Sequence, residues 1–95
     1  MLGVESRRLP LRRPGVWLRQ AGHENAIVDP TTGAVHMLND TALAIWHLCD
    51  GGTSPDEMVQ AICDVSRLHQ EVVEEDVTRI LGEFDAAGIL AWADA

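Results

Sequence analysis

The sequence predicts an α+β domain in which a three-stranded antiparallel sheet is followed by three helices, as in a winged helix-turn-helix unit. Apolar and polar residues alternate between residues 16 and 38, which is typical of half-buried strands. After Asn39 the apolar residues recur at helical spacing instead. A chain of 95 residues has room for one such domain, and no internal repeat divides it.

Three short strands are expected at residues 16–20, 25–29 and 34–38. Residues 21–24 form the first turn. The second turn spans residues 29–33, where Pro30 fixes φ and Gly33 can adopt a left-handed conformation. Tight turns join consecutive strands into a meander, so the strand at 25–29 is central and the other two are edges.

The three helices are marked by their ends. Asn39 or Asp40 caps a helix that runs to residue 49 and is stopped by two glycines. Ser54 begins the next helix, since Pro55 follows it and Glu57 completes a capping box. The third helix carries an apolar stripe and ends at Gly88, after which the chain folds back on the core; the stripe and the returning residues are Val73, Val77, Ile80, Leu81, Phe84, Ile89, Leu90 and Trp92.

The charge is divided unevenly along the chain. All seven cations are arginines, and five of them lie in the first nineteen residues; the rest of the chain carries two arginines against fourteen carboxylates. Residues 1–13 show no periodicity and contain Pro10, so we expect a flexible Arg-rich arm there and a folded domain over residues 14–95. The arm could contact an acidic surface, but a solvated tail is favoured.

The composition argues against several classes of function. An acidic body repels nucleic acid, and the third helix carries six carboxylates against Arg79 alone, which disfavours a winged-helix DNA-binding regulator. The longest apolar runs fall far short of the roughly 18 residues of a membrane span. Charges stand where a signal peptide has its apolar segment, and two cysteines form no disulfide framework. We therefore expect a cytoplasmic protein with no membrane or nucleic-acid partner.

Few residues have the spacing that catalysis or metal binding requires. The histidines and cysteines form no metal-binding motif, and no glycine-rich phosphate loop is present. His47 and Cys49 lie about 200° apart on a helix and cannot converge on one ion. A Cys–His catalytic pair is the alternative, although Cys63 on an apolar stripe is typical of a buried thiol. The sequence predicts no cofactor, no metal and no enzyme activity.

The third strand is the most informative element, because it is an edge without the usual protection. Pro14 and Arg19 flank the first strand, whereas residues 34–38 contain no proline and no formal charge. Such an edge is either covered by the protein's own structure or reserved for an added strand. A reserved edge would bind an extended peptide, with the third helix as the other wall; its lining would be Ala34, Val35, His36, Met37 and Leu38, facing a helix flank of Asp76, Ile80, Glu83 and Ala87.

Several of these segments resemble PqqD-like proteins, which are called RiPP recognition elements. The similar runs span about residues 14–90 and are residues 26–33, Leu38-Asn39, residues 49–53, Asp76-Val77, Ile80-Leu81, Phe84 and residues 88–90. The joint between hairpin and helix is similar to that of the small leader-binding proteins of lasso-peptide clusters.

The resemblance implies a non-catalytic binding module. Members bind the leader of a ribosomally made precursor peptide, which adds a strand beside the third strand and packs on the third helix. They present the precursor to a tailoring enzyme, such as a leader peptidase or a radical-SAM enzyme. Carried over to this chain, the resemblance assigns one wall to Val35, His36, Met37 and Leu38 and the other to Asp76, Ile80 and Glu83. The acidic helix suggests a leader with lysine or arginine near its apolar anchors. A homodimer joined through the edge strands is a further alternative.

Overall fold

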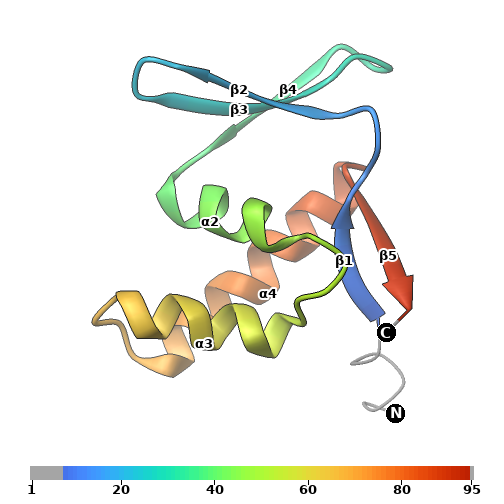
Figure 1. Cartoon of the computed structure of the whole chain (residues 1–95). Coiled ribbons are helices and arrows are strands. Elements are labelled where there is room, and N and C mark those ends of the chain that lie inside the picture. Colours follow the sequence, from blue (N-terminus) through green and yellow to red (C-terminus); the bar gives the residue numbers. More distant parts are fainter. Residues whose placement is uncertain (1–7, 95) are drawn as a thin grey trace.

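The computed structural model describes residues 8–94 and arranges them as two small sheets beside three helices (Figure 1). The elements in chain order are β1 (Arg8–Arg12), β2 (Trp17–Ala21), β3 (Glu24–Asp29), β4 (Ala34–Leu38), α2 (Asp40–Leu48), α3 (Pro55–Val65), α4 (Gln70–Ala86) and β5 (Leu90–Asp94). Within residues 8–94, no helix is both long and apolar enough to cross a membrane.

The three-stranded sheet has the predicted topology. Its order is β2-β3-β4, both pairs are antiparallel, and β3 is central. The register places Ile27 of β3 between Leu18 of β2 and His36 of β4, so these three side chains share one face. Ile27 is fully buried, which identifies this face as the one that covers the helices.

The helix ends also agree with the sequence. The side-chain oxygen of Asn39 accepts a hydrogen bond from the Ala42 N–H at 2.8 Å, which caps α2. Ser54 and Glu57 form the reciprocal capping box at the start of α3. Gly88 has φ of +75°, the left-handed conformation that ends α4 and turns the chain into β5.

The core lies between the sheet and the helices. Its fully buried members include Ile27 of β3, Ile45 of α2, Met58 of α3 and Val73 and Val77 of α4. The rings of Trp46 and Phe84 meet edge to face, with centroids 5.5 Å apart, and join α2 to α4. The apolar stripe of α4 therefore lies at the centre of the core.

The expected flexible arm over residues 1–13 is wrong for residues 8–13, and residues 1–7 lie outside the described residues. Arg8–Arg12 forms β1, which pairs antiparallel with β5 as a two-stranded ribbon. The Arg12 guanidinium donates to the carbonyls of Trp46 and His47 at 3.0 and 2.9 Å, so it caps the C-terminus of α2. Arg13 forms an ion pair of 2.7 Å with the buried Asp29.

These contacts explain why an arginine-rich, proline-containing segment is ordered. Two of its cations are used inside the fold, and the ring of Pro10 is buried. The domain boundary expected at residue 14 therefore moves back at least to residue 8. The returning residues Ile89 and Leu90 are buried as expected, and the strand that Leu90 begins is an addition to the predicted elements.

Candidate functional site

The outer edge of β4 is unpaired among residues 8–94. Its inner edge bonds to β3, and no described strand lies on the other side. Val35 and Met37 point away from the helices and are 48% and 59% exposed, whereas His36 and Leu38 face the helices. Of the two alternatives left open by the sequence, coverage of this edge by another strand of the described part of the chain is excluded.

A hollow of about 200 Å³ lies between β4 and the C-terminal half of α4. We call it the β4–α4 hollow. Its lining residues are His36, Met37, Leu38, Glu83, Phe84, Ala87 and Ile89. Five of these seven residues are apolar, and Glu83 and His36 are the polar ones. The volume suits one apolar side chain better than a cofactor.

His36, one of the residues that line this hollow, carries an unusual atom. Its Nε2 is buried and has no hydrogen-bond partner among the described residues. A buried polar atom without a partner costs free energy, and such atoms are uncommon in folded proteins. The wall therefore retains hydrogen-bonding capacity that the fold itself does not use.

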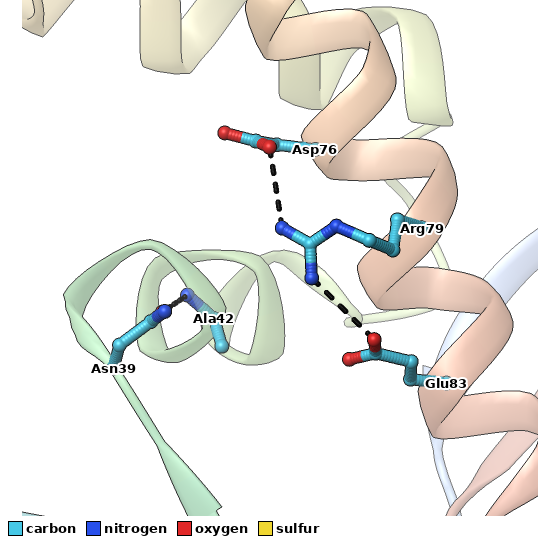
Figure 2. Close-up of polar contacts among 5 residues, drawn as sticks. All are labelled: Asn39, Ala42, Asp76, Arg79 and Glu83. Carbon is cyan, nitrogen blue, oxygen red and sulfur yellow. Dashed lines mark hydrogen bonds and ion pairs between the residues drawn. The ribbon is translucent and has the colours of Figure 1, made fainter.

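The charged rim of α4 is already paired. Arg79 reaches between Asp76 and Glu83, at 3.2 and 3.4 Å, and all three side chains point to the same side of the helix (Figure 2). Hydrogen bonding to Asp76 and the charge of Glu83 raise the pKa of Arg79 above its ordinary value. Arg79 and Glu83 are largely exposed and Asp76 is partly exposed, so the pairs contribute little to stability and can rearrange.

The structure brings together some of the expected site residues and separates others. His36, Met37, Leu38 and Glu83 surround the hollow, and Ala34 and Val35 continue the same strand. Ile80 is only 2% exposed and packs in the core, so it supports the wall without lining it. Asp76 lies two turns from Glu83, at the far end of the Arg79 network.

Two lining residues lie outside the strand and the helix flank that the sequence assigned to the groove: Phe84 and Ile89. Ala87 lies on the predicted helix flank, and its small side chain leaves the hollow open. Phe84 belongs to the apolar stripe of the third helix, and the sequence pattern did not indicate that Phe84 reaches a surface. Ile89 follows Gly88, which ends the helix. A glycine there predicts that the chain returns to the core, but it does not predict that Ile89 lines a hollow.

Cys49 does not have the environment of a nucleophile. Its side chain is fully buried, and burial raises the pKa of the thiol to about 12. His47, two residues earlier, is exposed to solvent. In the described part of the chain, no three histidine, cysteine or acidic residues are grouped as metal ligands.

Comparison with known proteins gives one family and a set of similar folds. Residues 24–90 match the family model of coenzyme PQQ synthesis protein D (PqqD). Among solved structures, TbiB1 in complex with the TbiA(beta) leader peptide is similar to this chain at a TM-score of 0.74 and 25% identity, covering 84% of this chain and 93% of that one.

A second similar structure is a lasso peptide synthetase B1 complexed with the leader peptide, at a TM-score of 0.77 and 22% identity. It covers 86% of this chain and 96% of the other, and at this identity the likeness concerns the fold. Comparison with curated protein sequences gave no match.

Proposed function

Because this chain belongs to the PqqD family, we propose that it binds the leader segment of a ribosomally made precursor peptide and catalyses no reaction itself. The observation that carries the proposal is the unpaired edge of β4 beside the β4–α4 hollow. The structure similar to this chain at 25% identity is a complex with a leader peptide, which supports the same function.

The leader would bind by strand addition. An extended peptide beside β4 forms main-chain hydrogen bonds with the unpaired edge, and these bonds supply affinity with little sequence preference. Every second side chain of an added strand faces the helices, so one of them can enter the hollow between His36 and Ala87. Sequence preference would come from that side chain.

The charged side chains on the rim of α4 change the charge that we expect of the leader. Asp76 and Glu83 are not a bare acidic wall, since Arg79 lies between them. A peptide lysine can replace Arg79 beside Glu83, and a peptide carboxylate can pair with Arg79. We therefore expect the apolar side chain in the hollow to decide affinity and the charges to adjust it.

The bound precursor would then be presented to a tailoring enzyme, a leader peptidase or a radical-SAM enzyme. The chain would act in the cytoplasm, where the precursor is synthesised. The unpaired edge could alternatively join two copies of the chain, and the measurements below distinguish that case.

The test is a titration with the synthetic leader of the precursor encoded beside this chain. Fluorescence anisotropy gives the affinity, and amide NMR maps the surface. We expect saturable binding with shifts at Ala34–Leu38 and near Glu83 and Ala87. Shifts confined to other surfaces, or no binding by folded protein, would contradict the proposal.

Methylated leader peptides test the strand addition without altering the protein. An N-methyl group removes one peptide N–H, so peptides methylated at successive positions should lose affinity in a period of two, by about tenfold where a ladder bond is lost. A loss without this period would argue for a different binding mode. Sedimentation over the micromolar range shows whether the edges pair with each other instead.

A further inference from the structure

A second concave surface lies on the other side of α4, away from the β4–α4 hollow. Two adjoining hollows of about 270 and 370 Å³ share Pro55, Asp85 and Trp92, and we call them together the Trp92 cleft. Its other lining residues are Arg8 of β1 and Thr78, Leu81 and Gly82 of α4. The cleft therefore joins the ribbon, the start of α3 and the back of α4.

Trp92 is a fixed wall of this cleft. Its indole N–H donates to the Asp85 carboxylate at 2.9 Å, and the Arg8 guanidinium lies over the ring at 5.8 Å from its centre. Both contacts hold the ring against α4 while the side chain remains half-buried. Tryptophan and arginine are the residues most enriched where protein partners bind tightly.

Gly82 opens the floor of the cleft, and the fold gives no reason for a glycine there. It lies inside α4, where glycine is among the poorest helix formers. A Cβ added at this position would meet no atom within 4 Å, so no packing contact requires its absence. The bare backbone does leave room for another chain to approach the helix closely.

The two concave surfaces can be occupied together. Asp85 of the cleft and Glu83 of the β4–α4 hollow are two residues apart, which places them about 200° apart around the helix axis. A peptide beside β4 and a partner in the Trp92 cleft would thus contact opposite flanks of α4.

We propose that the Trp92 cleft is the docking surface for the tailoring enzyme, and that it receives an apolar side chain of that enzyme flanked by a carboxylate. The inference rests on the proposed function, since it assumes that a leader is being presented. Leu81, Pro55 and Trp92 supply the apolar lining. The carboxylate follows from Arg8, which is exposed and forms no ion pair within residues 8–94, whereas Arg12 and Arg13 are used inside the fold.

The test compares two affinities of the same variants. Gly82→Gln places a side chain in the cleft without weakening the helix, and Arg8→Glu reverses the charge at its rim. With the purified tailoring enzyme encoded beside the precursor as the probe, calorimetry should show enzyme affinity reduced about tenfold or more by Gly82→Gln and severalfold by Arg8→Glu. Leader affinity, measured by anisotropy, should stay within about twofold of wild type because the hollow lies on the other flank.

Matched variants control for the added side chain and for net charge. Ala61→Gln adds a glutamine at an exposed position of α3 outside the lining of the cleft, and Arg67→Glu makes the same charge reversal between α3 and α4; both should leave enzyme affinity unchanged. Enzyme affinity that is insensitive to Gly82→Gln, or a wild-type chain that binds leader but not the enzyme, would overturn the inference. Self-association that is lost in Gly82→Gln would identify a second copy as the occupant and would also overturn it. If the wild-type chain does not bind the leader, the proposed function itself is refuted.

Discussion

The two small sheets of this molecule differ in whether the outer edge of a strand is hydrogen-bonded. In the ribbon, the edge of β1 is covered: the Arg12 N–H donates to the Cys49 carbonyl at 2.9 Å, and the Gly51 N–H donates to the Pro10 carbonyl at 3.0 Å. In the three-stranded sheet, the outer edge of β4 has no such partner among residues 8–94. A fold that can cover one edge with a short loop leaves the other bare beside a hollow, which is the arrangement expected of a site that accepts a strand.

The largest expected effect comes from breaking the covered edge. Gly51 has φ of +78°, and an added Cβ would lie 3.2 Å from the side chain of Leu11. Gly51→Val should lower the free energy of unfolding by about 2 kcal/mol, because a β-branched residue is strained in the left-handed region. Urea denaturation measures the change. Gly52→Val, whose Cβ would meet only ordinary contacts, is the control; equal losses in both variants would show that backbone strain at Gly51 is not the cause.

The next test fills the hollow beside the bare edge. Ala87→Leu adds three carbon atoms in the space between α4 and β4, and Ala87 is the C-cap of α4 with right-handed backbone angles that leucine also adopts. We expect leader affinity to fall by about tenfold, equivalent to about 1.4 kcal/mol, with little change in stability. Ala86→Leu makes the same change at an exposed neighbour and should leave affinity unchanged. If Ala87→Leu binds leader as tightly as wild type, no peptide side chain enters this hollow.

The difference between the sheets also separates what the sequence could predict from what it could not. The three-stranded sheet and the helices depend on turns, caps and periodicity within a few residues, so Asn39, Ser54 and Gly88 marked their ends correctly. The ribbon pairs residues near the two ends of the chain, and its first strand is ordered by contacts such as Arg12 with the end of α2. No local pattern reports a contact of that kind.

The same distinction applies within the candidate site. The bare edge at residues 34–38 followed from the order of the strands, and Glu83 from its flank of the helix. The apolar stripe already placed Ile80 toward the core, but a helical projection could not tell whether Ile80 also lines the groove, nor that Arg79 bonds to both acidic neighbours. Rotamers and tertiary packing decide these points, and both depend on the assembled structure.

An acid titration tests the link between the ribbon and the three-stranded sheet. Burial raises the pKa of Asp29, but hydrogen bonds from the Thr31 N–H and Arg13 outweigh it and hold the pKa below its ordinary 3.8. A lowered folded-state pKa adds stability above about pH 4, and this is lost as the pH falls through the folded value. Wild type should therefore be more stable than Asp29→Asn at pH 5, and the difference should shrink toward pH 2 in urea denaturation. A difference that is constant with pH would show that the carboxylate charge contributes nothing.

The smallest expected effect is a change in the alkylation rate of a cysteine, which reports directly on the covered edge of β1. Cys49, whose carbonyl accepts the Arg12 N–H, is fully buried, and burial raises the pKa of its thiol to about 12. Cys63 on α3 is half-buried and serves as an internal reference. With iodoacetamide at pH 8, native protein should be alkylated at Cys63 while Cys49 stays protected, because its thiolate forms only when the edge opens. Mass spectrometry of the digested protein measures both sites. In Gly51→Val, Cys49 should be alkylated faster while the alkylation rate of Cys63 stays the same. Equal alkylation rates at both cysteines in wild type would show that the covered edge opens freely, and the contrast between the two sheets would then not hold.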